Sequence, residues 1–294
     1  MSRVMRTPVR RFEPVAHEAP AVRWLWLRGA APWTPRFETG AASLRGSAHL
    51  ENEDSALAVL PAPALLAVAD GVGGGAQGKV ASGALVERLR LLRPGLLSDR
   101  QALREWLLAA DDAVAGEVAR YSDQAGASTF VAAVPARRGR RWLLTWTGDC
   151  RAYCASARRL AQLTQDETYD NLGEAPPAGA QADDPARMVG SGAVDQPQVA
   201  AYSLADSEVL MLCSDGVHKW VPPQQMLSLL RGGGSLQQRC MALVAAAHAN
   251  GGTDDATVVA IQRHGHALSR RERGLLVLAL LAGAAAGAWL WWPR

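Results

Sequence analysis

The chain has 294 residues, of which 49% are hydrophobic and 20% are charged. This composition suffices for a buried core in one large or two small domains, and it excludes a disordered chain. The formal net charge is only +3, and no basic stripe with interleaved aromatic residues occurs, which excludes nucleic acid as a partner. The four cysteines form no CxxC pair, so we expect buried free thiols in a reducing compartment.

The N-terminal region is expected to contain an extension followed by strands. Residues 1–20 predict a flexible extension, and the basic start lacks the apolar segment of a signal peptide. An alternating pattern predicts a strand at 21–28. Two short apolar runs, at 57–60 and 65–69, are separated by prolines and predict a hairpin.

Helices and strands alternate in groups along the rest of the chain. Apolar residues at helical spacing predict helices at 78–92, 101–120 and 236–247. Further strands are predicted as a meander over 128–163 and at 198–203, 208–213 and 256–262. Between them, residues 168–193 are rich in Ala, Pro, Gly and Asp and predict a long loop or flap. Because most strand connections are short, we expect an α+β fold with helices layered on antiparallel sheets.

The C-terminal end of the chain is strongly apolar. Residues 275–292 carry no charge and consist mostly of Leu, Ala, Val and Trp, which predicts a transmembrane helix. Arginines at 270, 271 and 273 precede this run and would keep the large N-terminal part on the cytoplasmic side. A buried core helix is the alternative interpretation of the same run.

Two apolar runs end in similar acidic turns. Residues 64–69 lead into Asp70 and Gly71, and residues 209–213 lead into Asp215 and Gly216. A buried strand that ends in an aspartate and a glycine turn places a carboxylate at the rim of a sheet. Two such strands can direct two carboxylates to one point, where hard divalent cations bind.

Other carboxylates occupy comparable positions, namely Glu53, Asp54, Asp149, Asp254 and Asp255. No histidine cluster accompanies them and no cysteines have ligand spacing, so an oxygen-only shell favours Mg²⁺ or Mn²⁺ over Zn²⁺. Each motif alone has a simpler interpretation, because Asp-Gly is first of all a turn signal. The set of motifs together is what favours a metal site.

In this order and spacing the motifs resemble the metal-dependent serine/threonine protein phosphatases of the PP2C (PPM) type, especially the small bacterial members. The resemblance covers about 44–262. It rests on the segments 52–54 (NED), 69–74 (ADGVGG), 148–153 (GDCRAY), 163–166 (LTQD), 213–216 (CSDG) and 251–257 (GGTDDAT).

The resemblance implies a PP2C-like β-sandwich of two antiparallel sheets flanked by helix pairs in an α-β-β-α arrangement. The chain then divides into a flexible extension at 1–20, a phosphatase domain at 21–264, a basic juxtamembrane linker at 265–273 and a transmembrane helix at 274–292. The apolar run and the arginines before it predict a single-pass protein of the inner (cytoplasmic) membrane with its catalytic domain in the cytoplasm.

The same resemblance assigns two Mn²⁺ or Mg²⁺ ions to the acidic residues, with a third ion left open. Asp70 would bridge the two ions, and the backbone carbonyl of Gly71 would bind one of them. Asp215 and Asp254 would complete the shell of the first ion, while Glu53 and Asp54 would hold the second ion and its waters. A metal-bridging hydroxide would then hydrolyse phosphoserine or phosphothreonine in a protein substrate.

Several positions depart from the family pattern, among them Glu167, which stands where histidine is usual, and Asp255, which replaces the usual asparagine. His49 stands where an arginine usually grips the substrate phosphate, which predicts weaker and more pH-dependent phosphate binding. Lys219 stands where an aspartate usually joins Asp149 at the third metal. Either that ion is absent or the Lys219 ammonium replaces its charge, and an ion pair of Lys219 with Asp149 is our preferred hypothesis.

The leading functional interpretation is an active phosphatase that opposes a bacterial serine/threonine kinase at the membrane. The alternative is a catalytically weak or inactive phosphatase-like module that senses a phosphoprotein, as the changes at His49 and Lys219 would allow. A phosphatase effector domain that controls a transcription factor is a third interpretation, but it would require an attached sensor domain. Some family members act on secretion machinery, including type VI systems, and the sequence leaves the pathway open.

Overall fold

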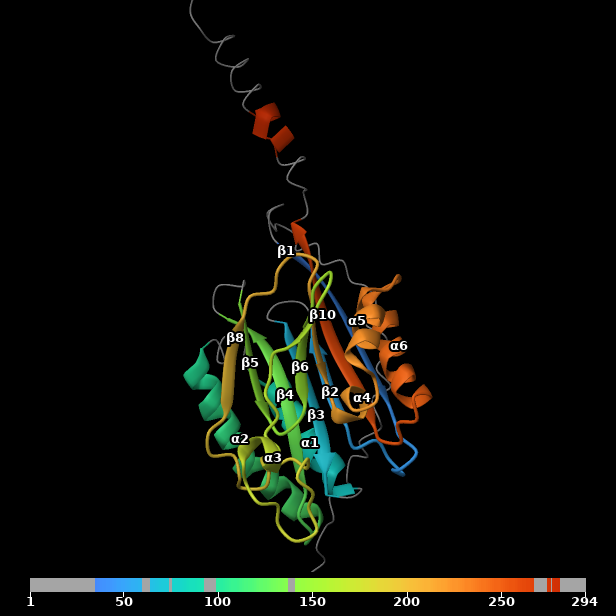
Figure 1. The fold of residues 1–294 in the computed structure, drawn as a ribbon. Helices are drawn as coiled ribbons and strands as arrows, with labels where there is room; N and C mark the ends of the chain where they lie inside the picture. The colour runs from blue at the N-terminus through green and yellow to red at the C-terminus, as the bar shows by residue number, and fades with distance from the viewer. Residues whose placement is uncertain are drawn as a thin grey trace, which may run out of the picture.

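The computed structural model describes residues 35–59, 64–73, 76–92, 99–136, 141–266, 274–275 and 277–280. These residues form two five-stranded sheets in which every strand pair is antiparallel (Figure 1). One sheet, sheet A, has the order β1 (Pro35–Leu44), β10 (Ala256–His266), β9 (Val209–Cys213), β6 (Arg151–Ala155) and β7 (Leu160–Gln162). The other, sheet B, has the order β2 (Ser55–Val59), β3 (Leu65–Val72), β4 (Ala127–Pro135), β5 (Trp142–Thr147) and β8 (Gln198–Tyr202).

Helices cover both outer faces of this sandwich. The helices α1 (Ala76–Arg90) and α2 (Arg100–Tyr121) pack their buried side chains on sheet B. The helices α4 (Asp215–His218), α5 (Pro223–Arg231) and α6 (Leu236–Ala249) pack on sheet A (Figure 1). A third apolar cluster, which includes Leu66, Val131 and Leu212, fills the space between the sheets. The arrangement is the α-β-β-α sandwich that the sequence predicted.

Local sequence explains why the main helices form where they do. Asp99 accepts a hydrogen bond from the backbone N–H of Ala102 and so caps α2. Ser235 and Gln238 form a reciprocal capping box at the start of α6. In both helices the buried residues recur at three- to four-residue spacing, which turns one face toward a sheet.

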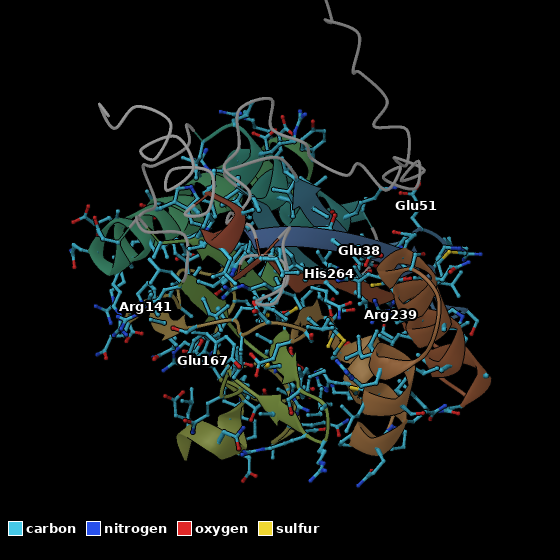
Figure 2. All side chains as sticks on the ribbon, turned by 90° about the horizontal axis from the view of Figure 1, so that it is seen from above. Glu38, Glu51, Arg141, Glu167, Arg239 and His264 are labelled. Atoms are coloured by element: carbon cyan, nitrogen blue, oxygen red, sulfur yellow. The ribbon has the colours of Figure 1, made fainter. Side chains whose placement is uncertain are left out.

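Charged and polar contacts of Glu38 connect β1, the edge strand of sheet A, to α6. Figure 2 shows Glu38, His264 and Arg239 near one another, where β1, β10 and α6 meet. One Glu38 carboxylate oxygen lies 2.9 Å from His264 Nε2, and the other accepts a hydrogen bond of 2.6 Å from the backbone N–H of Leu236. Because Leu236 is the first residue of α6, Glu38 also satisfies one N–H at the start of that helix.

Two features of the strands differ from the sequence prediction. The strand β1 was not expected, because Gly40, Ala41 and Ala42 give its segment little strand propensity. It forms because it pairs with β10 along nine residue pairs. The meander expected over 128–163 also divides: β4 and β5 belong to sheet B, whereas β6 and β7 belong to sheet A. The chain therefore changes sheets at Gly148 and Asp149.

The prediction of a C-terminal membrane anchor is wrong. Among the described residues, no helix is both long enough and apolar enough to cross a membrane. This finding overturns the transmembrane helix at 274–292, the inner-membrane location and the membrane as a partner. The prediction rested on the apolar character of the run and on the arginines that precede it.

Several predicted segments lie outside the described residues. They are the extension at 1–20, the strand at 21–28, Gly74, most of the linker at 265–273, and residues 276 and 281–292 of the apolar run.

Candidate metal centre

Five aspartates from both sheets come together at one end of the sandwich. Asp70 lies near the end of β3, and the charges of Asp54, Asp149, Asp215 and Asp254 all raise its pKa. Burial is the largest cause of that shift, which leaves the pKa of Asp70 well above its usual value. Because the charges of the other four all act on Asp70, we treat these five aspartates as one group, here called the carboxylate cluster.

Glycines let the backbone approach closely beside Asp70. A Cβ atom on Gly71 would lie 2.2 Å from the carbonyl oxygen of Gly78 in the first turn of α1. A Cβ atom on Gly78 would lie 2.2 Å from Glu53 Oε2. Larger residues at 71 and 78 would therefore push β3, α1 and Glu53 apart.

Asp54 is held by one of its two carboxylate oxygens. The Ser214 hydroxyl, which comes from the other sheet, donates a hydrogen bond of 2.7 Å to Asp54 Oδ2. Ser214 is fixed in turn, because its Oγ accepts a hydrogen bond of 3.0 Å from the backbone N–H of Thr257. Burial, with the nearby charges of Asp255 and Asp215, keeps the pKa of Asp54 well above its usual value.

Asp215 is held in a similar way by a cation. Lys219, four residues later at the C-cap of α4, places its Nζ 2.7 Å from Asp215 Oδ2. The same Nζ lies 3.7 Å from Asp149 Oδ2. Burial opposes ionisation of Asp215, but the Lys219 ammonium outweighs it and keeps the pKa of Asp215 below its usual value.

The oxygen atoms of these two aspartates fit a divalent cation. Asp54 Oδ1 and Asp215 Oδ1 are both buried and have no hydrogen-bond partner among the described residues. Leaving such atoms without a partner is costly unless a ligand satisfies them. Each carboxylate thus has one oxygen held by the protein and one available, as expected for preorganised ligands of a hard ion.

A loop carries the remaining predicted residues beside the cluster. Asp255 accepts hydrogen bonds of 2.7 Å from the backbone N–H groups of Gly46 and Glu53 and so anchors both ends of the segment 46–53. His49 Nδ1 lies 3.1 Å from Asp255 Oδ2 and 3.6 Å from Asp254 Oδ1. Burial opposes protonation of His49, but the hydrogen bond to Asp255 and the neighbouring carboxylates raise its pKa.

His49, Asp254 and Asp255 are also near enough to one another to share an ion. Each offers a ligand atom, and these atoms lie within 4.8 Å of one another. Among the residues that the structure describes, no other set of three or more His, Cys, Asp or Glu side chains has ligand atoms this close together. Asp254 thus belongs both to this group and to the carboxylate cluster.

The segment after β7 holds the backbone next to Asp149 in place. Glu167, which stands where the family usually has histidine, accepts a hydrogen bond of 3.2 Å from the backbone N–H of Gly148. Its own N–H donates a bond of 2.9 Å to the Gly148 carbonyl. Burial raises the pKa of Asp149 to about 7, with Asp215 adding to the shift and Lys219 opposing it.

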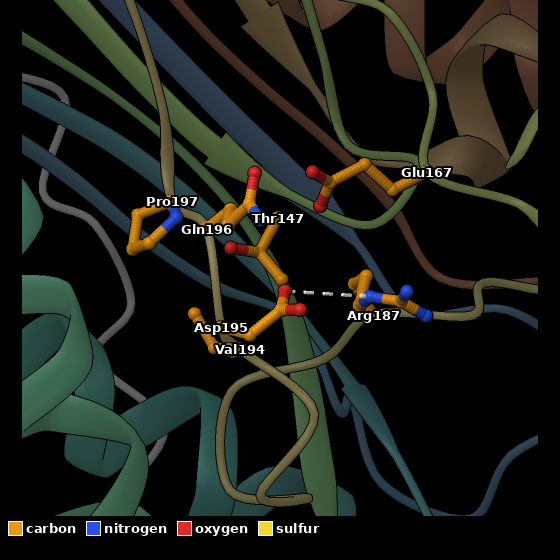
Figure 3. A pocket seen from close by; sticks show the side chains of 7 residues that line it. All are labelled: Thr147, Glu167, Arg187, Val194, Asp195, Gln196 and Pro197. Carbon is orange, nitrogen blue, oxygen red and sulfur yellow. Dashed lines mark ion pairs between the residues drawn. The ribbon is translucent and has the colours of Figure 1, made fainter.

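A small pocket lies under the same segment. It is lined by Thr147, Glu167, Arg187, Val194, Asp195, Gln196 and Pro197 (Figure 3). Arg187 Nε lies 3.9 Å from Asp195 Oδ1 across it, and the same guanidinium forms two hydrogen bonds with Glu174. None of the five clustered aspartates lines this pocket, so the candidate chemistry lies elsewhere.

The sequence located the acidic residues but not what holds them. The structure brings together Asp54, Asp70, Asp149, Asp215 and Asp254, buries Glu53 beside α1, and places His49 next to Asp254. Ser214 was missed because its bond to Asp54 spans 160 positions and leaves no local signal. The Asp215–Lys219 pair had a signal, since a spacing of four residues brings side chains together on a helix.

Comparison with known proteins agrees with this geometry. Residues 45–248 match the family model described as Protein phosphatase 2C. The chain belongs to the protein phosphatase 2C family. The curated relatives of this PP2C chain are named serine/threonine phosphatases, and its solved structural neighbours include PPM phosphatases.

Two relatives illustrate the range of similarity. The serine/threonine protein phosphatase PstP of Mycobacterium tuberculosis (strain ATCC 25618 / H37Rv) is 30% identical over 231 residues, which are 74% of this chain and 43% of PstP. The chain therefore spans less than half the length of that relative. The phosphatase stp of Listeria monocytogenes (serotype 4b, strain F2365) is 27% identical over 219 residues, which are 68% of this chain and 84% of stp.

Solved structures share the fold. PppA, described as a key regulatory component of T6SS in Pseudomonas aeruginosa, superposes with a TM-score of 0.67 at 26% identity, covering 77% of this chain and 97% of PppA. The catalytic domain of PstP in complex with 2 manganese ions gives a TM-score of 0.66 at 29% identity, covering 79% of this chain and all of that domain.

Proposed function

We propose that this PP2C-family chain is an active protein phosphatase that hydrolyses phosphoserine and phosphothreonine in proteins with the help of two divalent ions. Asp54, Asp70, Asp215 and Asp254, with the Gly71 carbonyl, would hold the ions, and Glu53 would support the second of them. The observation that carries the proposal is the pair of buried, unpartnered oxygens Asp54 Oδ1 and Asp215 Oδ1 inside a cluster of five aspartates. Mn²⁺ or Mg²⁺ is the class of ion that an all-oxygen set favours.

When bound, two such ions supply charge neutralisation for the phosphate and activation of a water for in-line attack. The side chains around the site hold the ligand carboxylates in a fixed orientation. Ser214 and Lys219 each fix one oxygen of a ligand carboxylate, so the other oxygen has a defined direction. Asp255 fixes the loop that carries His49 and Glu53.

His49 is the proposed contact for the substrate phosphate. It is one-third exposed, and its raised pKa favours the charged imidazolium. A protonated histidine donates one charge-assisted hydrogen bond to a phosphate oxygen, whereas an arginine fork donates two. We therefore expect phosphate capture that is weaker than with arginine and that declines as the pH rises through the pKa of His49.

The biological role follows from the reaction. Phosphoserine and phosphothreonine in proteins are made by protein kinases, so the proposed enzyme opposes a serine/threonine kinase. The substrate class is a phosphoprotein whose phosphorylated residue can reach the rim of the sandwich.

Hydrolysis assays on the purified chain test the proposal. With Mn²⁺ we expect hydrolysis of p-nitrophenyl phosphate and of a phosphothreonine peptide, lost in EDTA and reduced about 10³-fold or more in Asp215→Asn. The matched control is Asp206→Asn, which removes an exposed aspartate near the other end of β9 and should leave the rate unchanged. Activity that survives both EDTA and Asp215→Asn would refute the metal mechanism. Binding of the phosphopeptide without turnover would favour the alternative, a phosphatase-like sensing module.

A further inference from the structure

Lysine is rare in this chain. It occurs at positions 79 and 219 only, and arginine supplies the other basic residues among the 31. Lys79 pairs with Glu51 on the surface, whereas Lys219 reaches into the carboxylate cluster. Lysine carries its charge on a compact ammonium, while arginine spreads it over a planar fork that needs more space. A lysine at 219 therefore places a single compact charge beside two carboxylates.

Lys219 touches two members of the cluster at once. Its Nζ lies 2.7 Å from Asp215 Oδ2 and 3.7 Å from Asp149 Oδ2. The two aspartates come from different segments, Asp149 from the turn between β5 and β6 and Asp215 from the start of α4. The ammonium thus bridges two carboxylates, as a bound cation would.

Neighbouring basic groups do not neutralise Asp149 in its place. The Arg151 guanidinium is engaged by Asp166, with nitrogen–oxygen distances of 2.6 to 2.9 Å. The ring of His218 lies 3.0 Å from the backbone carbonyl of Asp149 rather than from its carboxylate. Burial also lowers the pKa of His218 to about 4, so this ring is neutral near pH 7.

The Lys219 ammonium supplies one of the positive charges that face the five aspartates; the buried Glu53 and Asp255 beside the cluster are not included in this count. Five aspartates influence one another, namely Asp54, Asp70, Asp149, Asp215 and Asp254. Two divalent ions would supply four positive charges, and the Lys219 ammonium supplies the fifth. A further divalent ion would have to share Asp149 and Asp215 with that ammonium and would be repelled by it.

We propose that Lys219 is a built-in counter-ion of the carboxylate cluster, which limits the cluster to two divalent ions and holds Asp149 and Asp215 together before they bind. This inference rests on the proposed function, because it assumes that the cluster is a metal centre. In this role Lys219 is a positioning residue. Asp149 is its partner and not a metal ligand in the native chain.

Counting bound ions tests the inference directly. The full chain is dialysed against saturating Mn²⁺, and the free and bound ion are measured by electron paramagnetic resonance. We expect two ions in the native protein and three in Lys219→Met, because removal of the ammonium frees Asp149 Oδ2 and Asp215 Oδ2 for another cation. Lys219→Arg keeps the charge and should bind two ions.

Two further variants distinguish loss of the Lys219 charge from a general disturbance of the fold. Lys79→Met removes the other lysine, whose ion pair with Glu51 is also 2.7 Å long, and should leave the count at two. Asp149→Asn in the otherwise native chain should also bind two ions, because Asp149 is not a ligand there. In the Lys219→Met background, Asp149→Asn should bring the count back from three to two.

Specific results would overturn the inference. These are an equal ion count in Lys219→Met and the native chain, a count of three in Lys219→Arg, or the loss of one ion in Asp149→Asn alone. The last result is informative even if Lys219→Met does not fold. Hydrolysis of p-nitrophenyl phosphate, measured in parallel, separates the two proposals: a native chain that binds two ions without hydrolysis refutes the function and leaves the counter-ion role standing.

Discussion

Asp70 and Asp215 follow similar apolar strands and precede similar glycines, yet their surroundings give them opposite properties. Asp70, on sheet B, is surrounded by like charges and has a pKa well above its usual value, because it is buried and close to four other aspartates. Asp215, on the sheet A side, has a pKa below its usual value, because Lys219 outweighs its burial. Asp254 and Asp255, also on the sheet A side, have His49 as a basic neighbour.

The difference between Asp70 and Asp215 shows how the carboxylate cluster can stay folded when no ions are bound. Among the described residues, no ion pair reaches Asp70 or Asp54, while the basic groups gather on the sheet A side. One side of the cluster is thus neutralised by the chain, and the other side remains to be neutralised by cations. The same local motif yields both results because the neighbours, not the motif, set the charge.

The largest test compares Asp70→Asn with Asp215→Asn in the metal-free protein. Asp70→Asn removes a crowded negative charge and should raise the free energy of unfolding by about 1–3 kcal/mol. Asp215→Asn breaks a pair with Lys219 and should lower it by about 1 kcal/mol, a figure kept small because Lys219 is 44% exposed. Urea unfolding in EDTA measures both, with Asp206→Asn as control. Effects of the same sign would contradict the comparison.

A second test uses pH. Folded Asp149 keeps its proton to about pH 7, whereas the unfolded carboxyl releases it near its ordinary value of 3.8. The folded state therefore binds more protons between these values, so the stability of the metal-free protein should fall as the pH rises from about 4 to about 7. The two states differ by up to one bound proton across this range, so the free energy of unfolding should fall by up to ~1.4 kcal/mol per pH unit. Thermal unfolding in EDTA at several pH values measures it.

Two comparisons sharpen this pH test. Asp149→Asn should make the decline shallower, because one of the groups responsible is gone, while Asp54 and Asp70 keep their raised pKa values. Saturating Mn²⁺ should flatten it as well, since bound cations favour the ionised cluster. A profile that rises from pH 5 to pH 7 in EDTA would show that the crowded carboxylates do not control stability.

The smallest expected effect concerns His49. His49→Arg should lower KM for a phosphothreonine peptide a few-fold with little change in kcat, because the guanidinium donates two hydrogen bonds and remains charged at all working pH values. The gain should be larger at pH 8.5 than at pH 6.5, where native His49 is more fully protonated. Steady-state kinetics at both pH values check this. An unchanged KM at pH 8.5 would remove His49 from phosphate binding.

The sequence predicted much of the fold because its apolar periods match the observed elements. The helix expected at 101–120 is α2 (Arg100–Tyr121), and the expected hairpin is β2 with β3. The strand β1 could not be seen, because its Gly-Ala-Ala segment gains its strand conformation only from pairing with β10. The change of sheet at Gly148 was likewise invisible, since a turn within one sheet and a crossover between two have the same local pattern.

The sequence pointed to the carboxylates of the candidate site, but not to the hydrogen bonds that hold them in place. Asp54, Asp70, Asp215 and Asp254 stand in ordered motifs, so single-chain pattern was enough to find them. The hydrogen bond from Ser214 to Asp54 joins two sheets and depends on their packing. Asp255, a departure from the family pattern, proved to anchor the loop at 46–53 because a carboxylate can accept both backbone hydrogen bonds.

The pairing of β1 with β10 also determines where the fold can be pulled. Pro35 lies opposite His266 at one end of this ladder, and Leu44 lies opposite Ala256 at the other, next to the carboxylate cluster. The main chain therefore enters and leaves the sandwich at a single pole, about 30 Å of strand away from the aspartates. A force that pulls Pro35 and His266 apart would break the β1–β10 pairing one residue pair at a time. It would reach Leu44 and Ala256, next to the carboxylate cluster, last.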